Sequence, residues 1–547
     1  MNQIDIKNRL YVLSVLLFCI NIQSTETTES NTTQPNTTQP NTTQSNTTQI
    51  DTEIYSNHNN NLVNQQVLDN SDTDSMRRPT PHHTKPPKPN SSSWPNNTVS
   101  QNMSESHNMS NWQNSAESYD TNYPTQQNHP GSPDPSFGPN KQGYVINTMG
   151  SRSQARAVAI HKNNKIVVAG IRDDYPVLVQ YNENGSLDPN FGLGNYGPGV
   201  VIQINMGQTS YFNAVAIQKC GQKIVAAGSS NGECFLARYY DNGTLDTKFG
   251  NQGIIKTHIP GELYAIAIQK DNKIIVAGYN TLHTSDTQIM LIRYNENGSL
   301  DDTFGFGTQG AVFTPVEKFS RAHGITIQED NKIIVVGNVK TDNRNVIVIA
   351  RYNENGALDR NFGHNNSGTH IIIPYNLNYN NFAYDVKVPN NGDINIVIAA
   401  SETHFNKSMF NLYYLGDRGT AWSGLRFSPT LPTSPENNNS YLRSVAIDEN
   451  KRMIAMGYTI IDGQSYFSLG RTTQDGFFDR TFGDYWDHGL YTATKILPIM
   501  SGNAVNRNQL PVVGALQGNN KKIVLVGNYS PNHPETTNQF AVARFLN

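Results

Sequence analysis

Cysteine is scarce in this sequence, with 3 residues among 547. Cys19 falls in an N-terminal apolar segment, so only Cys220 and Cys234 belong to the rest of the chain. They flank the predicted strand Lys223–Gly228. A strand rises about 3.3 Å per residue, which separates its ends by more than the roughly 7 Å that a disulfide allows. We expect two unpaired, half-buried thiols, and no histidine stands at a spacing that favours a cysteine nucleophile.

Charged residues are also few, at 16% of the chain, and the net charge is −3. Neither the acidic residues 1–135 nor the slightly basic residues 136–547 contain a dense basic patch, which argues against a nucleic-acid partner. A Gly-rich phosphate loop, a His-Glu-X-X-His pattern and a Gly-X-Ser-X-Gly elbow are missing as well. We therefore expect no cofactor and no metal, and the sequence indicates an architecture more clearly than an activity.

Long apolar runs are missing except at the N-terminus. Lys7 and Arg9 precede an apolar run from Leu10 to Ile22, a pattern typical of a secretory signal peptide and too short for a spanning helix. We assign residues 1–24 to this signal. Lipid attachment at Cys19 is the alternative, which the bulky Phe18 disfavours. After signal removal we expect no transmembrane segment. We expect a protein that is secreted or located at the cell surface, a class that includes the periplasm and the cell envelope.

Residues 25–135 are of low complexity. The pentad Asn-Thr-Thr-Gln-(Pro/Ser) begins at Asn31, Asn36, Asn41 and Asn46, and Asn, Ser, Thr, Gln and Pro dominate the rest. Such a composition cannot bury enough apolar surface to offset the entropy of ordering the chain. The segment is predicted to be a disordered spacer.

Two motifs recur along residues 136–547 at intervals of roughly sixty residues, which is typical of a propeller, a solenoid or an array. The first is Leu-Asp-X-X-Phe-Gly, complete or partial, with its phenylalanine at Phe137, Phe191, Phe249, Phe304, Phe362 and Phe482. The second is an apolar run that ends in a small residue, found at Lys165–Gly170, Lys223–Gly228, Lys273–Gly278, Lys332–Gly337, Asp393–Ala400, Arg452–Gly457 and Lys522–Gly527.

Each repeat contains four short strand patterns. In the first repeat these are Arg156–Ile160, Lys165–Gly170, Val177–Tyr181 and Gly197–Ile204, with turns between them. Seven such repeats predict an all-β fold, a seven-bladed β-propeller with four-stranded antiparallel blades; a β-solenoid would need shorter coils and fewer hairpins.

The two ends of the repeat region predict a closed ring. The chain ends on a third strand, 540–547, while an unpaired fourth strand, 143–148, precedes the first complete repeat. Pairing these segments would cover two exposed edges. The N-terminal strand is therefore predicted to complete the last blade, with the disordered tail before it.

The repeats resemble the delta-60 repeats of exported bacterial proteins. The resemblance rests on units such as Ala214–Gly228, followed by Phe235–Tyr239 and Gly243–Gly250, and it covers about 135–547. It implies a secreted or surface-associated bacterial propeller. The family has no assigned activity, so the resemblance transfers no functional residue. The fifth and sixth repeats depart most from the pattern.

Residues that recur in most repeats are best explained by structural needs. The phenylalanine should pack between blades and the glycine after it should permit a turn. Arginine recurs in the third strand and aspartate after the following turn, so we expect Arg–Asp pairing or Asp turn capping in each such repeat. The loop Asn182–Asp188 is compatible with turn chemistry or, with fewer carboxylates than usual, with calcium.

A ligand site is expected where the innermost strands enter the propeller, because loops and strand entries on a rigid ring usually carry function. The residues at this position vary between repeats: Arg156, Asn213, Tyr264, His323, Tyr384, Arg443 and Val512. Apart from Val512 they suit recognition of a carbohydrate or peptide by stacking and hydrogen bonding. A solvated rim without a ligand is the alternative. The cluster Asp484–His488 could instead hold a metal or perform acid–base chemistry.

The sequence therefore favours a monomeric, non-catalytic binding module for an unknown protein or glycan. One alternative is a secreted hydrolase or lyase with its site on the divergent fifth and sixth blades. Another is a purely structural envelope protein. An enzyme needs a converging set of titratable groups that occurs at one place, whereas this chain mostly repeats the same structural positions.

Overall fold

The computed structural model describes residues 129–547 with gaps, the longest of which are 203–208, 374–378, 390–395, 428–438, 484–497, 502–511 and 530–538. The predicted signal peptide 1–24, most of the predicted spacer 25–135 and the cluster Asp484–His488 lie outside the described residues. The regular secondary structure of the described part consists of β-strands and one short 3-10 helix, η2 (His364–Asn366).

Most strands form four-stranded antiparallel sheets that follow the order of the chain. The first contains β2 (Ser153–Ile160), β3 (Ile166–Arg172), β4 (Tyr175–Tyr181) and β5 (Val200–Ile202). Another contains β13 (Lys318–Ile327), β14 (Ile333–Thr341), β15 (Arg344–Tyr352) and β16 (Thr369–Ile372). The next contains β17 (Asn380–Lys387), β18 (Ile396–His404), β19 (Lys407–Leu415) and β20 (Ala421–Phe427). It is followed by β21 (Asn439–Ile447), β22 (Met453–Ile461), β23 (Gln464–Arg471) and β24 (Pro498–Ser501).

The second and third repeats share one strand. Their sheet contains β6 (Ser210–Ile217), β7 (Ile224–Ser230), β8 (Glu233–Tyr239), β9 (Ile254–Ile268), β10 (Ile274–His283), β11 (Asp286–Tyr294) and β12 (Ala311–Thr314). The part of β9 before Gly261 pairs with β8, and the part from Gly261 on pairs with β10. One continuous strand thus takes the place of the two separate strands that the sequence predicts here.

Segments from both ends of the described chain meet in one sheet. Its strands are β25 (Val513–Gln517), β26 (Lys522–Tyr529), β27 (Gln539–Leu546) and β1 (Tyr144–Thr148). Tyr144 faces Ala543 and Thr148 faces Gln539, so β1 and β27 are antiparallel neighbours. Asp134 lies before β1 and accepts a hydrogen bond from Arg544 Nε at 2.7 Å. The predicted pairing of segments 143–148 and 540–547 is present.

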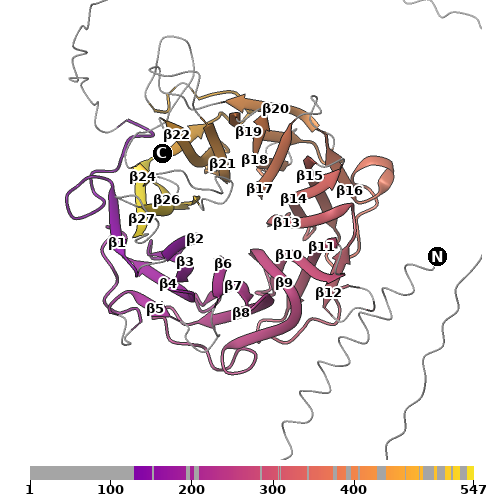
Figure 1. Ribbon diagram of the computed structural model, residues 1–547, viewed down its shortest axis with the longest axis horizontal. Helices are drawn as coiled ribbons and strands as arrows, with labels where there is room; N and C mark the ends of the chain where they lie inside the picture. Colours follow the sequence, from indigo (N-terminus) through magenta and orange to yellow (C-terminus); the bar gives the residue numbers. More distant parts are fainter. Residues whose placement is uncertain are drawn as a thin grey trace, which may run out of the picture. The chain divides into compact units, whose positions relative to one another are not determined.

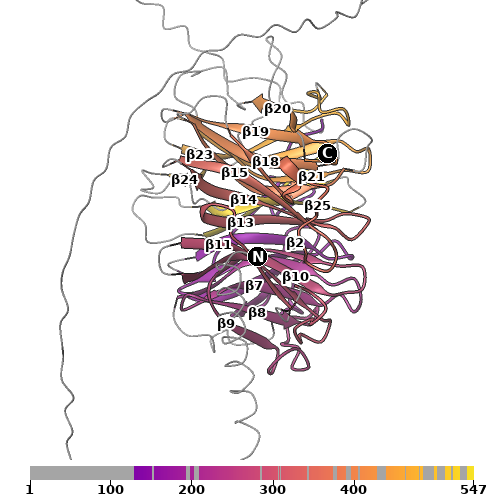
Figure 2. The same cartoon turned by 90° about the vertical axis from the view of Figure 1, so that its right-hand side faces the viewer.

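The innermost strands surround a common centre (Figure 1); they are β2, β6, β9, β13, β17 and β21. Figure 2 shows the same sheets after a 90° turn. Each innermost strand contacts the next, and β25 contacts both β21 and β2. The apolar core lies between neighbouring sheets. Ala157 and Leu178 of one sheet, for example, form a cluster with Phe212 and Phe235 of the next, and each fully buried large apolar side chain contributes about 1.5–3 kcal/mol.

Candidate functional site

Six of the predicted site residues occupy the same structural position. Arg156, Asn213, Tyr264, His323, Tyr384 and Arg443 each lie at a register shift, where their strand has one residue more than its partner strand. Such a β-bulge leaves the extra residue unpaired and redirects its side chain. We call these six residues the axial ring. The sequence located their position but not the bulge.

The small residue that ends the second motif lies opposite each bulge. At five of the six bulges it is a glycine, namely Gly170, Gly228, Gly278, Gly337 or Gly457. A Cβ added at Gly337 would overlap the carbonyl oxygen of Arg321, and the other four glycines meet the equivalent carbonyl in the same way. Ala400 takes this place in the divergent fifth repeat. The close approach of the two backbones therefore explains why the second motif ends in a small residue, which the sequence alone did not explain.

The axial ring is joined by polar contacts on its first side. Arg156 Nη1 donates a hydrogen bond to Asn213 Oδ1 at 2.8 Å, and Asn213 Nδ2 donates to the carbonyl of Leu263 at 3.1 Å. The guanidinium of Arg156 also lies 4.2 Å from the centre of the Tyr211 ring. Burial lowers the pKa of Arg156 from its usual value. These contacts fix three neighbouring innermost strands relative to one another.

Aromatic contacts continue the ring on its other side. The Tyr264 and His323 rings are 5.0 Å apart between centroids, and the His323 and Tyr384 rings are 6.1 Å apart. The guanidinium of Arg443 lies 3.9 Å from the centre of the Tyr384 ring. Arg443 is buried, whereas the other five members of the axial ring are half-buried. The structure thus brings all six predicted residues together along neighbouring strands.

Val512 does not share this role. It is 2% exposed and belongs to the apolar cluster between the last sheets, and β25 begins after it without a register shift. In the sequence of its strand, Val512 nevertheless stands at the position that the axial-ring residues occupy in the other sheets, directly before the first residue that pairs with the neighbouring strand. A valine here packs into the core because it has no polar group to direct toward solvent.

A second layer of side chains lies two residues before the axial ring, and sequence reasoning missed it. Its members are Gln154, Tyr211, Glu262, Arg321, Phe382 and Tyr441. Tyr279 Oη donates a hydrogen bond to Glu262 at 3.0 Å, and Tyr211 and Tyr264 lie close enough to this carboxylate for its charge to raise their pKa values. Burial and the Glu262 charge raise the pKa of Tyr211 to about 12. The alternation of side chains along a strand could have located this layer in the sequence.

Arg443 is held by tyrosines. Its Nη2 donates to Tyr458 Oη at 3.5 Å, and its guanidinium lies 5.9 Å from the centre of the Tyr441 ring. The Tyr441 and Tyr458 rings stack with centroids 4.8 Å apart. Burial raises the pKa of Tyr458, so this hydroxyl stays neutral at physiological pH. The guanidinium is therefore stabilised by ring faces and a neutral hydroxyl.

His323 is expected to make the fold more sensitive to acid. Burial and the nearby Arg321 and Arg443 charges lower its pKa to about 3, whereas an unfolded chain has a histidine pKa near ~6.5. Between these values the unfolded state binds the proton, so this contribution to stability decreases as the pH falls below ~6.5. We expect the loss of melting temperature between pH 7 and pH 4 to be smaller in His323→Gln than in the wild type. Scanning calorimetry at both pH values measures it, and an equal loss in both proteins would contradict the assignment.

The repeated Arg and Asp residues form structural networks. Arg238 Nε donates to Asp246 Oδ2 at 2.8 Å, and Asp246 Oδ1 accepts from the backbone of Lys248 at 3.3 Å. Pairing and turn capping therefore occur together. The same ion pair joins Arg293 to Asp301, Arg351 to Asp359, Arg471 to Asp479 and Arg544 to Asp134. The basic residue that begins the second motif also reaches the aspartate, as Lys223 does at 2.9 Å, a role that the sequence did not reveal.

The networks also connect one repeat to the next. The guanidinium of Arg238 lies 4.3 Å from the centre of the buried Phe249 ring, and Arg238 Nη1 donates to the carbonyl of Glu296 in the following repeat. Gly298 of that repeat lies directly against the Phe249 ring. The prediction that this phenylalanine packs between repeats is confirmed.

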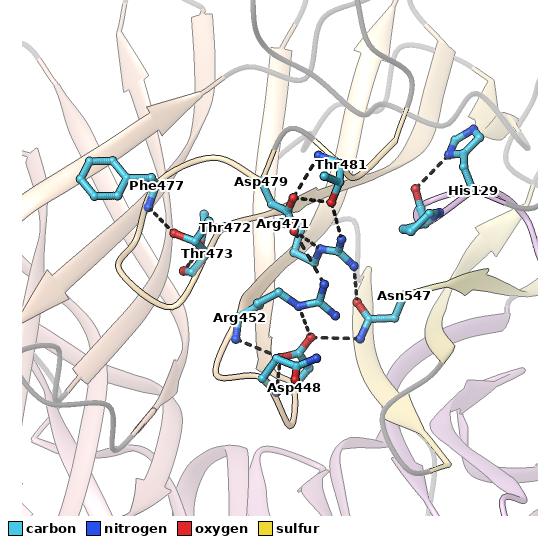
Figure 3. A network of polar contacts seen from close by, with 12 residues as sticks. His129, Asp448, Arg452, Arg471, Thr472, Thr473, Phe477, Asp479, Thr481 and Asn547 are labelled. Carbon is cyan, nitrogen blue, oxygen red and sulfur yellow. Dashed lines mark hydrogen bonds and ion pairs between the residues drawn. The ribbon is translucent and has the colours of Figure 1, made fainter.

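The last network includes the C-terminal residue. Arg471 Nη1 donates to Asn547 Oδ1 at 3.0 Å, and Asn547 Nδ2 donates to Asp448 Oδ2 at 3.3 Å (Figure 3). Arg452 Nε donates to the same Asp448 oxygen at 2.7 Å. These side chains bind one another within the fold, which indicates a structural network.

The loop 182–188 uses its side chains for turn formation. Asn184 Oδ1 accepts from the backbone and the hydroxyl of Ser186, and Asp188 Oδ2 pairs with Lys165 Nζ at 2.7 Å. Across the described residues no group of three or more His, Cys, Asp or Glu side chains could hold a metal ion. The hydrogen bonds of Asn184 and the ion pair of Asp188 fit the turn interpretation of the loop.

Neither Cys220 nor Cys234 forms a disulfide, as expected, but neither is half-buried. Cys220 is exposed and Cys234 is buried in the core, where burial raises its pKa. Among the described residues, no helix is long and apolar enough to cross a membrane.

Three segments of the chain match one family model, the "Domain of unknown function (DUF5122) beta-propeller". They are residues 161–191, 269–304 and 328–362. Each match runs from the turn after an innermost strand to the phenylalanine of the first motif. Together with the antiparallel sheets, this match defines an all-β protein with β-propeller repeats. No curated protein sequence matches the chain.

Several solved structures are similar in part. A protein from Lactobacillus plantarum has 11% identity and a TM-score of 0.38, with 59% of this chain and 83% of that chain covered. Sqt1 from Chaetomium thermophilum has 13% identity and a TM-score of 0.39, with 74% and 100% covered. An ulvan lyase of polysaccharide lyase family PL25 has 10% identity and a TM-score of 0.41, with 73% and 96% covered. Similarities this weak do not indicate a function.

Proposed function

We propose that this chain is an exported, non-catalytic binding module that recognises a protein or a glycan with its axial ring. The module is a closed, seven-bladed β-propeller carried on the spacer 25–135, and it acts as a monomer. Support for export comes from the signal-like segment 1–24. Support for closure comes from the succession of contacts between innermost strands and from the pairing of β1 with β27.

The observation that carries the proposal is the bulge at each axial-ring residue. Six strands each present one arginine, asparagine, tyrosine or histidine side chain at the same structural position. Bulges often lie next to functional sites, where they redirect side chains. Residues that merely stabilise each repeat would be alike, as the Arg–Asp pairs are. The variety at the axial ring favours recognition of one asymmetric ligand.

The proposal favours binding over catalysis because most repeated titratable groups already have structural partners. Asp246, for example, is engaged by Arg238, Lys223 and the turn backbone. A hydrolase or lyase needs a base or acid with a pKa adjusted for proton transfer at the site. The axial ring instead contains a histidine whose pKa is lowered to about 3 and tyrosines whose pKa values are raised by burial.

Binding of purified protein to glycan and peptide arrays, followed by calorimetric titration of each hit, tests the proposal. We expect Tyr264→Ala combined with Tyr384→Ala to weaken binding by about tenfold or more, because two aromatic contacts are lost. The control Phe477→Ala removes a ring that is 72% exposed on a turn outside the axial ring and should bind like the wild type. Circular dichroism verifies that the variants fold.

Equal binding by the axial-ring variant and the wild type would place the site elsewhere. Turnover of a hit, detected as new reducing ends or cleaved peptide, would favour the hydrolase or lyase. An absence of any ligand would favour a structural envelope protein.

A further inference from the structure

Arg321 in the second layer differs from the other arginines at the centre. Arg156 donates to Asn213 and Gln154, and Arg443 donates to Tyr458. In the described part of the chain, no hydrogen-bond or ion-pair partner is present for the half-buried Arg321 guanidinium. It lies 4.5 Å from the centre of the Tyr279 ring. A planar group with several unused donors, held against a ring face, is suited to accept an anion.

The Tyr279 ring that contacts Arg321 is itself held by its neighbours. Tyr279 Oη donates to Glu262 at 3.0 Å, and the Tyr279 ring stacks on Tyr264 with centroids 5.9 Å apart. Burial and the Glu262 charge raise the pKa of Tyr279. The hydroxyl therefore keeps its proton and its hydrogen bond, and the guanidinium is held in place before a ligand arrives. Such preorganisation reduces the entropy lost on binding.

The charge around Arg321 favours an anion. Arg156, Arg321 and Arg443 carry positive charge, while Asp385 is engaged by Lys387 and by Ser444. Glu262 remains as the opposing carboxylate, and it accepts a hydrogen bond from the Tyr279 hydroxyl. His323 is neutral at physiological pH. The positive charges therefore exceed the negative charge at the centre.

The side chains of the axial ring and the second layer are all polar or aromatic, and none is aliphatic. Peptide partners are usually anchored by side chains that fill apolar pockets. Sugars are instead bound by aromatic rings together with planar hydrogen-bonding groups. Asn213, Gln154 and the half-buried Tyr264 and Tyr384 supply both kinds of contact.

We propose that the axial ring binds an anionic glycan whose carboxylate or sulfate group pairs with Arg321. The Tyr264 and Tyr384 rings contact the sugar, and Asn213 and Gln154 hydrogen-bond its hydroxyls. This inference rests on the proposed binding function and narrows its ligand class.

Calorimetric titration of the purified full chain tests it with matched probes. Oligogalacturonate and a sulfated galactan oligosaccharide are the anionic glycans, methyl-esterified oligogalacturonate is the neutral counterpart, and an oligoglutamate peptide is the acidic non-sugar. We expect binding of at least one anionic glycan. Esterification should weaken oligogalacturonate binding by about tenfold or more, the usual effect of losing a charged hydrogen bond.

Single-residue variants test whether Arg321 binds the anionic group. Arg321→Gln should reduce affinity for the anionic glycan by about tenfold or more, while Arg321→Lys should recover only part of it because the planar fork is lost. Glu262→Gln should increase affinity a few-fold by removing the opposing charge. Lys248→Gln removes one charge from an exposed position and should have no effect. Binding of both glycans unchanged in Arg321→Gln would overturn the inference.

The outcomes separate this inference from the proposed function. Equal affinity for the acidic and esterified probes, or preference for the peptide, would overturn the anionic glycan while leaving a binding module. Failure of every probe here, together with failure of the glycan and peptide arrays, would overturn both.

Discussion

Asp246→Asn is expected to lower the free energy of unfolding by about 3–5 kcal/mol, the usual effect of leaving a buried charge without its partner. The Asp246 side chain is fully buried, and its Oδ2 lies 2.8 Å from Arg238 and 2.9 Å from Lys223. These partners lower the carboxyl pKa to about 2, against the burial that would raise it. The contribution is therefore complete above the unfolded pKa and is lost as the pH falls through about 2.

A double-mutant cycle measures the interaction. Arg238→Met alone should also be strongly destabilising. The double variant should lose much less stability than the sum of the two single losses, because it removes both charges and leaves neither buried without its partner. Denaturant titration gives the three values. Additive losses would contradict the pairing.

The first repeat offers a natural control. Gln180 stands there in place of the arginine, and Asp188 pairs with Lys165 alone at 2.7 Å. Asp188→Asn leaves no buried guanidinium behind, so its effect should be smaller than that of Asp246→Asn. An equal effect would assign the stability to turn capping.

Gly337→Ala is expected to destabilise the fold by about 3 kcal/mol or more, which is at the upper end for overpacking. The added Cβ would overlap the carbonyl oxygen of Arg321, which belongs to the backbone and cannot move away like a side chain. The bulge at His323 would have to change with it.

Ala400→Gly is the matched control, because Ala400 already occupies the equivalent position opposite Tyr384. It should change stability by about 1 kcal/mol or less, the usual difference between the two residues. Thermal unfolding compares the variants, and a Gly337→Ala protein as stable as the wild type would contradict the close backbone approach.

Much of the strand pattern could be predicted from the sequence because every repeat restates it. The predicted Arg156–Ile160 corresponds to β2 (Ser153–Ile160), and Val177–Tyr181 to β4 (Tyr175–Tyr181). The Arg–Asp pairing was predictable for the same reason. A single repeat would not have distinguished these residues from ordinary surface charge.

The bulges and the role of Arg321 could not be predicted in this way. A bulge is a property of two paired strands, and neither strand alone reveals where its register shifts. The role of Arg321 depends on Tyr279 in a neighbouring sheet, whose ring it contacts. The fusion of two strands into β9 likewise replaces an expected loop, because the residues before Gly261 pair with β8 and those from Gly261 on pair with β10.

The axial ring and the second layer are proposed to form one ligand site. A crystal structure of the full chain soaked with oligogalacturonate, or with the best array ligand, tests this most directly. We expect a bound ligand between the innermost strands, with an anionic group in hydrogen-bond contact with the Arg321 guanidinium and a ring against Tyr264 or Tyr384. A ligand bound on the outer turns, with the centre unchanged, would contradict the claim.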